Sequence, residues 1–171
     1  MPKVSLEPLA AHHAKQKVSA ALESVAEVSP WMPWCSERYC RADADTWIEE
    51  QALARREGTA YEFAVLDAAG AYVGGAGINC IRQDHHFANV GYWIRSSRTQ
   101  QGLGTAALRA LVAWSEAHTS LKRLEVVVAL DNPSSQRVAE KAGATKESLA
   151  RARLYLRGKF HDAYIYTFIR A

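Results

Sequence analysis

Hydrophobic residues recur along the chain at two spacings, one typical of helices and the other typical of strands. Spacings of three and four over residues 10–28 predict a helix, which the two prolines of SPWMPW end. DADTWIEEQALARREG predicts a second helix, with Asp43 or Asp45 as its N-cap and Gly58 as its C-terminal stop. A third helix follows RTQQGLGTAA, because apolar residues there share one face. The clearest helix is DNPSSQRVAEKAG, which Asn132 is placed to cap.

The strands are predicted from alternating patterns and from apolar runs. Residues 4–9 form a short first strand, and YEFAVL and AYVGGAGI flank the turn DAAG as a hairpin. ANVGYWI follows a polar loop, LKRLEVVVAL suits a strand covered on both faces, and SLARARLYL and FHDAYIYTFIR form a closing hairpin. The order β-α-α-β-β-β-α-β-α-β-β indicates an α/β fold with a mixed, mostly antiparallel sheet flanked by helices.

Composition narrows the class of protein. A length of 171 residues suits a single domain over residues 1–171, and the net charge of +3 suits an anionic ligand. No run of about five or more like charges is present, so no direct contact with nucleic acid is expected. Cys35, Cys40 and Cys80 are odd in number and lack paired spacing, which favours a reducing compartment and does not predict zinc. Without an apolar span or a signal-peptide pattern, a cytoplasmic protein that does not enter a membrane is expected.

RTQQGLGTAA, residues 98–107, raises the question of chemistry. Gly102 and Gly104 alone could form a tight turn before a helix. From Gly102 the stretch also fits the dinucleotide fingerprint G-x-G-x-x-G/A, but SSRTQQ separates it from the preceding strand, and too little chain follows for a six-stranded nucleotide fold. A third interpretation is a pyrophosphate cradle, in which N–H groups of Gln101 to Thr105 point at an anion from a helix start.

Four motifs in chain order carry a resemblance to a known family: SPWMPW, VGYWI with the RTQQGLGTAA loop, NPSSQRVAEKAG and HDAYIYTFIR. Over nearly its whole length the chain resembles the GCN5-related N-acetyltransferases, and most closely the Rim branch, which acetylates N-terminal amines of ribosomal proteins. The resemblance implies acetyl-coenzyme A as cosubstrate, no metal, and a homodimer as one expected assembly. Two positions depart from the family pattern. Thr99 replaces the first Arg or Gln of the motif R/Q-x-x-G-x-G/A, and Asn89 replaces a Glu that often serves as the base.

The resemblance also assigns roles to residues. It places pantetheine beside Trp93 to Arg95, where a splayed neighbouring strand would free backbone N–H groups to polarise the thioester carbonyl. The expected coenzyme A contacts are Trp93, Ile94, Arg95, Arg98, Gln100, Gln101, Gly102, Leu103, Gly104, Thr105, Asn132 and Ser135. Ser135 is expected to protonate the departing thiolate, and Asn132 to contact pantetheine as well as cap its helix. A cap alone would explain Asn132, and Ser135 could be an ordinary first-turn serine.

The sequence leaves the identity of the general base open. The candidates are Asp84, His85, His86 and Glu125. An α-amino group has a pKa of about 8, so a water relay could also suffice. No cluster of three metal ligands is evident in the sequence.

Acceptor binding is expected to draw on the aromatic residues of SPWMPW. Trp31, Met32 and Trp34 can form an apolar wall, and Tyr155, Tyr164 and Tyr166 could complete it, although core packing would also explain the tyrosines. The expected acceptor is the N-terminal α-amine of a protein, which attacks the thioester directly. The alternatives are a small-molecule amine as acceptor and, because of Asn89, a non-catalytic acyl-coenzyme A-binding regulatory domain.

Overall fold

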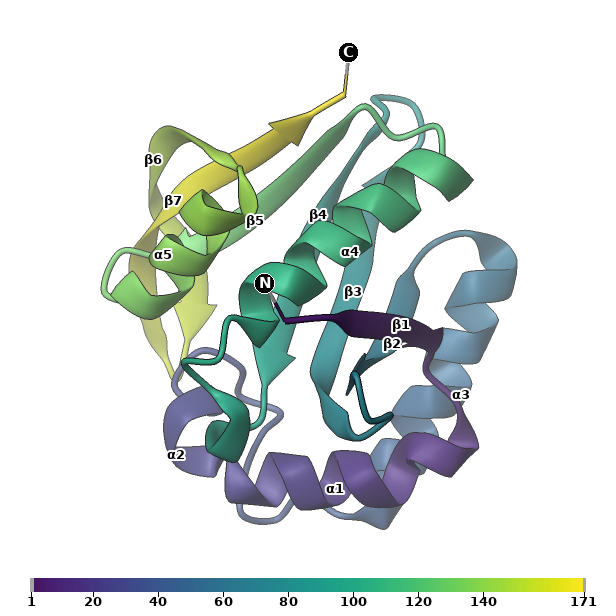
Figure 1. The fold of residues 1–171 in the computed structure, drawn as a ribbon. Helices are drawn as coiled ribbons and strands as arrows, with labels where there is room; N and C mark the ends of the chain where they lie inside the picture. Colours follow the sequence, from purple (N-terminus) through teal and green to yellow (C-terminus); the bar gives the residue numbers. More distant parts are fainter. Residues whose placement is uncertain (1, 171) are drawn as a thin grey trace.

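In the computed structural model, which describes residues 2–170, seven strands form one sheet in the order β1-β2-β3-β4-β5-β7-β6 (Figure 1). The strands are β1 (Val4–Pro8), β2 (Tyr61–Asp67), β3 (Tyr72–Arg82), β4 (Phe87–Ile94), β5 (Arg123–Ala129), β6 (Thr145–Leu156) and β7 (Lys159–Ile169). Neighbouring strands are antiparallel except β4 and β5, which run parallel and are joined through a helix. The prediction of a mixed, mostly antiparallel α/β sheet is confirmed.

Helices cover both faces of this sheet. They are α1 (Ala14–Glu23), α2 (Val25–Val28), α3 (Arg41–Glu57), α4 (Leu103–His118) and α5 (Pro133–Ala142), with short 3-10 turns η1 (Ala11–His13) and η2 (Ser96–Arg98). Helices α4 and α5 lie in front of the sheet in Figure 1, and α3 lies behind it. Strand β2 shows why both faces can be covered. Phe63 and Val65 pack toward α4, whereas Ala64 and Leu66 pack toward α1 and α3, because successive side chains point to opposite faces.

The single helix predicted over residues 10–28 is wrong, since Ser24 breaks it between α1 and α2. The Ser24 hydroxyl donates to the carbonyl oxygen of Ala20 at 2.6 Å and accepts from the N–H of Ser96 at 2.9 Å. A side chain that bonds back to the preceding turn competes with the helical pattern. The break therefore fastens α1 to the segment that follows β4.

The start of α3 also differs from the prediction. Its N-cap is Cys40, whose N–H donates to the carboxylate of Asp43 at 2.8 Å, so Asp43 lies inside the first turn. Asp45 lies further along and pairs with Arg41 across one turn. The predicted end is confirmed, because Gly58 adopts a left-handed φ of 70° after the last helical residue.

Strands β4 and β5 separate partway along their length. Their register pairs only Phe87–Asn89 with Arg123–Glu125, although β4 continues to Ile94 and β5 to Ala129. One edge of β4 is therefore unpaired with β5 from Val90 onward. The splay that the expected chemistry requires is present.

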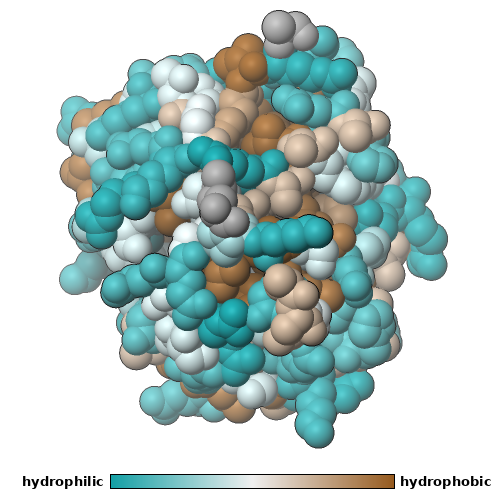
Figure 2. Space-filling view, viewed as in Figure 1, coloured by the Kyte–Doolittle hydropathy of each residue, from teal (hydrophilic) through white to brown (hydrophobic). Residues whose placement is uncertain are grey.

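The face that carries α4 and α5 is largely hydrophilic, with hydrophobic surface showing in patches toward its middle (Figure 2). The apolar side chains of α4 point inward instead, and Leu108 and Leu111 are fully buried. Among residues 2–170, no helix is both long enough and apolar enough to cross a membrane.

Candidate functional site

Among the described residues, no side chain caps the start of helix α4. Gly102 takes the N-cap position with a left-handed φ of 77°, and its carbonyl accepts the first helical bond from Ala106 at 3.0 Å. The N–H groups of Leu103–Thr105 consequently have no helical partner. By contrast, Asp43 and Asn132 bond to the starts of α3 and α5. The uncapped, positive end of α4 is suited to hold an anion.

The polar loop before α4 is held by its own side chains. Arg98 donates to the Asp67 carboxylate at 2.7 Å and to the Gln101 side chain at 3.2 Å. The hydroxyl of Thr99 turns back to the loop backbone, and Gln100 is exposed with a φ of 59°. Asp67 and Gln101 therefore hold the guanidinium of Arg98 beside the start of α4.

The unpaired edge of β4 presents backbone groups of alternate residues. The N–H of Arg95 donates to the carbonyl oxygen of Val73 at 2.8 Å, so Arg95 and, two residues back, Trp93 face β3. Tyr92 and Ile94 consequently direct their N–H groups into the splay. This differs from the predicted use of the whole stretch Trp93–Arg95, since only Ile94 of the three faces the splay.

The side chain of Arg95 is occupied elsewhere. Its guanidinium pairs with the carboxylate of Glu23 at the end of α1 and donates to the carbonyl oxygen of Tyr72 at 3.4 Å. Arg95 thus ties α1 to β4 and does not point into the cradle.

Two hydroxyl groups meet beside the splay. The Ser135 hydroxyl lies 3.1 Å from the phenol oxygen of Tyr92. Asn132 caps α5 by accepting from the Ser135 N–H at 3.1 Å, which fixes the first turn. Burial raises the pKa of Tyr92 to about 12, so the phenol keeps its proton near neutral pH. A Cβ at Gly104 would lie 2.9 Å from the Tyr92 ring, so this glycine lets α4 pack against it.

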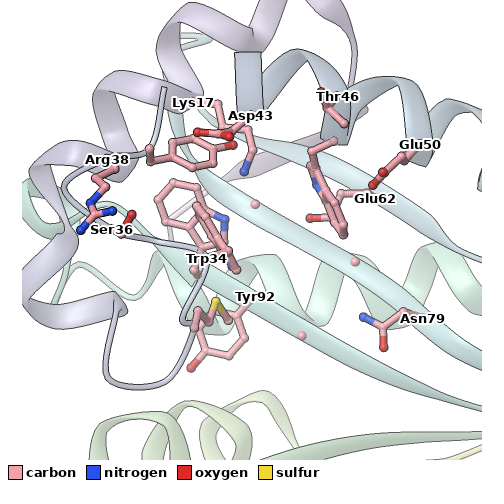
Figure 3. Close-up of a pocket in the computed structure, with 17 residues that line it drawn as sticks. Lys17, Trp34, Ser36, Arg38, Asp43, Thr46, Glu50, Glu62, Asn79 and Tyr92 are labelled. Carbon is pink, nitrogen blue, oxygen red and sulfur yellow. The ribbon is translucent and has the colours of Figure 1, made fainter. Parts of the chain in front are cut away.

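A cavity of about 760 Å³ opens on the other face of the sheet, between α3, the loop after α2 and strands β2–β4 (Figure 3). Met32 and Trp34 line it, as does Tyr92, so the cavity reaches the end of β4. Of the other residues predicted to bind the acceptor, Trp31 does not line the cavity. Tyr155 contacts Phe160 in the β6–β7 hairpin with the two rings tilted by 55°, and 63% of its surface is exposed. Tyr164 and Tyr166 pack on the α4 face.

A lysine and a glutamate that the sequence pattern did not single out lie in this cavity. The Lys17 ammonium is buried 4.3 Å from the ring centroid of Trp34 and 5.3 Å from that of Trp93. Burial lowers the pKa of Lys17, and the nearby Glu62 opposes that shift. Burial likewise raises the pKa of Glu62, against the attraction of Lys17 and Arg55.

Glycines of β3 make room for the Glu62 carboxylate. A Cβ at Gly77 would lie 1.9 Å from the Glu62 Oε2 atom, and one at Gly75 would lie 3.4 Å from Oε1. Any larger residue at position 77 would displace the carboxylate. The sequence signals were therefore the glycine-rich run GGAG in a strand and a lone acid in the apolar strand YEFAVL.

The predicted base candidates lie away from the cavity. Asp84, His85 and His86 form the turn between β3 and β4, at the far end of β4 from Tyr92. At about 3.3 Å of rise per residue, this turn is roughly 20 Å from the end of β4. Glu125 pairs in register with Asn89 and bonds to Arg123 at 2.7 Å.

Three potential metal ligands, Glu7, His12 and His13, do come together near the start of α1, which the sequence did not predict. The N–H of Ala10 donates to Nδ1 of His13 at 3.1 Å, so a neutral ring must carry its proton on Nε2. That Nε2 faces Glu7 Oε2 at 3.3 Å. The Nε2 atom is buried and makes no hydrogen bond within the described residues, and the ring nitrogen that accepts from the backbone is not free to bind a metal.

Known proteins share this architecture. A family model described as the acetyltransferase (GNAT) domain matches residues 3–145. The Bacillus subtilis protein YdaF is 31% identical over 101 residues, which are 59% of this chain and 55% of that protein. The chain thus matches about half the length of this curated relative. The ribosomal-protein-serine acetyltransferase of Escherichia coli is 22% identical over 95% of this chain and 90% of its own.

Solved structures agree in fold. RimJ of Mycobacterium smegmatis, in complex with CoA-disulfide, has a TM-score of 0.88 and 26% identity, covering 97% of this chain and 81% of that one. RimL, a ribosomal L7/L12 α-N-protein acetyltransferase in complex with coenzyme A, has a TM-score of 0.89 at 22% identity, covering 97% and 93% of the two chains. Since the family model spans most of the sequence and the fold agrees, the chain belongs to the GNAT acetyltransferase domain family.

Proposed function

We propose that this protein transfers an acetyl group from acetyl-coenzyme A to a primary amine, namely the N-terminal α-amine of a protein. The observation that carries the proposal is the unpaired edge of β4 beside the uncapped start of α4. The E. coli relative, a ribosomal-protein-serine acetyltransferase that aligns over 95% of this chain, supports a protein acceptor.

The residues present fit coenzyme A. The free N–H groups of Leu103–Thr105 suit its pyrophosphate, and Arg98 can add a charge there while it stays paired with Asp67. The backbone of Tyr92 and Ile94 can pair with the amide groups of pantetheine, as a further strand would. Acetyl-coenzyme A supplies the thioester, and the chain supplies the groups that bind and polarise it.

The chemistry requires a polarised carbonyl and a protonated leaving group. A backbone N–H at the β4 edge can donate to the carbonyl oxygen while the amine attacks the carbon. As the C–N bond forms and the C–S bond breaks, the Ser135 hydroxyl donates its proton toward the sulfur. The phenol oxygen of Tyr92 lies 3.1 Å away and keeps its proton. Tyr92 can therefore hold the Ser135 hydroxyl in position or return a proton to it.

The cavity on the opposite face of the sheet suits the acceptor. It meets the β4 edge at Tyr92, so an amine that enters from this side reaches the thioester from the face away from α4. Met32 and Trp34 supply an apolar wall for the chain that carries the amine. We also propose that the protein works in the cytoplasm. We further propose that it forms a homodimer, which analytical sedimentation tests.

A small-molecule amine is the second candidate acceptor. The cavity volume of about 760 Å³ lies in the range that holds a whole small ligand, and its walls carry several charged groups. The third hypothesis, a non-catalytic acyl-coenzyme A-binding domain, predicts binding without turnover.

A thiol-release assay separates these functions. The protein is incubated with acetyl-coenzyme A and a panel of amines, and free coenzyme A is measured over time. The panel contains peptides with free N-termini, the same peptides with blocked N-termini, and small amines. Release only with free N-termini supports the proposal. Release only with small amines assigns the second function, and calorimetric binding without release assigns the third.

A further inference from the structure

The proposed reaction needs a group that removes a proton from the acceptor amine, because only the neutral amine attacks. Asn89 stands where the family resemblance implies a Glu as the base, and its amide donates to Asn79 at 3.0 Å. The histidine loop lies at the far end of β4, and Glu125 is bonded to Arg123. Three carboxylates line the cavity, those of Asp43, Glu50 and Glu62. Asp43 accepts from the Cys40 N–H at the start of α3 and Glu50 is exposed on the same helix, whereas Glu62 lies on the sheet and is left unused by the reaction as described.

Strand register puts Glu62 in one row with two glycines. Glu62 on β2 pairs with Gly77 on β3, and Gly77 pairs with Gly91 on β4. The Glu62 carboxylate lies over Gly77, since a Cβ there would come within 1.9 Å of Oε2. The side chain therefore extends along this row from β2 toward β4.

The row ends at the unpaired edge of β4. The last residue of β4 that pairs with β5 is Asn89, two positions before Gly91. Neighbouring strands lie about 4.8 Å apart, so Gly91 is roughly 10 Å from the Glu62 backbone, and the carboxylate spans about half of that. The remaining gap, with no side chain at Gly77 or Gly91, has room for an amine or for one water molecule.

The carboxylate oxygens of Glu62 are open to a ligand. Within residues 2–170, no protein group donates a hydrogen bond to them, although Arg55 and Leu9 both donate to the Glu62 backbone carbonyl. Glu62 is only partly buried and lines the cavity, so its oxygens can accept a hydrogen bond from a ligand or from water there. Burial raises the pKa of Glu62, which brings its proton affinity closer to that of an amine near neutral pH.

Lys17 faces the same space from α1 (Figure 3). Its ammonium is held by the rings of Trp34 and Trp93, and its positive charge favours the ionised form of Glu62. The same charge disfavours a protonated acceptor amine in the cavity. Lys17 therefore lies where its charge favours an ionised Glu62 and a neutral amine.

We propose that Glu62 is the proton acceptor for the acceptor amine, directly or through one water, and that Gly77 and Gly91 keep its path to the β4 edge open. An N–H bond of the amine breaks as the O–H bond of the Glu62 carboxyl forms, and the proton later leaves to solvent. The nitrogen lone pair forms the new C–N bond while the thiolate departs. This inference rests on the proposed acetyl transfer.

The test compares Glu62→Gln with wild-type protein. The value of kcat/KM for the best amine of the panel is measured across pH, acetyl-coenzyme A affinity by calorimetry, and folding by thermal melting. Glu62→Gln is expected to lower kcat/KM by about 100-fold or more, to leave acetyl-coenzyme A affinity unchanged, and to abolish the rise of kcat/KM that ionisation of Glu62 causes as pH increases. Glu49→Gln, an exposed carboxylate on α3 outside the cavity, is the matched control.

A second variant keeps the outcomes distinct. Gly77→Ala displaces the carboxylate without removing it, and it is expected to lower kcat/KM with the same loss of the pH limb. If Glu62→Gln does not fold, the kinetics of Gly77→Ala decide whether Glu62 accepts the proton. Wild-type kcat/KM and pH profile in the folded variants would overturn the role of Glu62 alone. Absence of acetyl transfer by the wild-type protein would overturn the proposed function instead.

Discussion

Among single residues, Ser135 and Tyr92 show how a site arises from distant parts of the chain. The two oxygens lie 3.1 Å apart, yet the residues are 43 positions apart in sequence. Ser135 was predicted because its motif NPSSQRVAEKAG resembles that of a known family. Tyr92 had no such assignment, because its partner is known only once α5 packs beside β4.

Ser135→Ala is expected to lower kcat about 100-fold while acetyl-coenzyme A affinity changes little, because the hydroxyl acts on the departing sulfur. Steady-state kinetics and calorimetry measure the two quantities. Ser134→Ala, at the exposed neighbouring position, is the control and is expected to keep wild-type kinetics. An unchanged kcat in Ser135→Ala would remove this residue from the mechanism.

Glu62 illustrates what sequence could not supply at this scale. Its identity as a lone acid in an apolar strand was visible, but its function depends on Gly77 in the next strand and on Lys17 in α1. Both relations are fixed by strand register and helix docking rather than by local pattern. The polar loop with two histidines was a stronger local signal, and the fold puts it at the wrong end of β4.

At the scale of elements, the strands and the helices α3, α4 and α5 could be predicted because their periodicity and their Gly or Asn ends are local properties. The break at Ser24 could not, since helical spacing continues through it and its cause is a bond to Ser96, 72 residues away. The N-cap of α3 was misplaced for a related reason. Asp43 is a good capping residue, but it reaches back from inside the turn to Cys40.

The end of α1 carries a prediction about pH. Hydrogen bonds from Arg95 hold the pKa of Glu23 at about 2, below its unfolded value of about 4.5. Because the folded pKa is depressed, this stabilisation is present above about pH 4.5 and is lost as pH falls toward 2. The difference in melting temperature between wild type and Glu23→Gln is therefore expected to shrink between pH 6 and pH 3.

The matched comparison is Glu116→Gln, an exposed carboxylate on α4. It is expected to give a small difference in melting temperature that stays constant over the same range. A Glu23→Gln difference that grows on acidification would show that the pair with Arg95 does not stabilise the fold.

At the scale of the whole molecule, the splay between β4 and β5 puts an anion cradle on one side of the sheet and an acceptor cavity on the other. Sequence could suggest the cradle from its glycines but not the splay, which depends on how far two strands pair. The dinucleotide alternative fails at this scale, because β4 and β5 are the one parallel pair among the seven described strands.

Acetyl-coenzyme A, but not NAD, should therefore stabilise the folded protein. Acetyl-coenzyme A at 100 times its dissociation constant is expected to add about 2.7 kcal/mol, which corresponds to a rise in melting temperature of roughly 5–10 °C. NAD at the same concentration is expected to give no shift. A larger shift with NAD than with acetyl-coenzyme A would restore the dinucleotide interpretation of RTQQGLGTAA.

Acetyl transfer to a protein N-terminus can be measured by mass spectrometry of one peptide. The peptide carries a free α-amine and an internal lysine, and it is fragmented after incubation with the protein and acetyl-coenzyme A. The expected product bears one acetyl group, located on the α-amine. If acetyl-coenzyme A binds but the peptide stays unmodified, or is acetylated only on the lysine, the protein does not transfer acetyl groups to N-terminal amines.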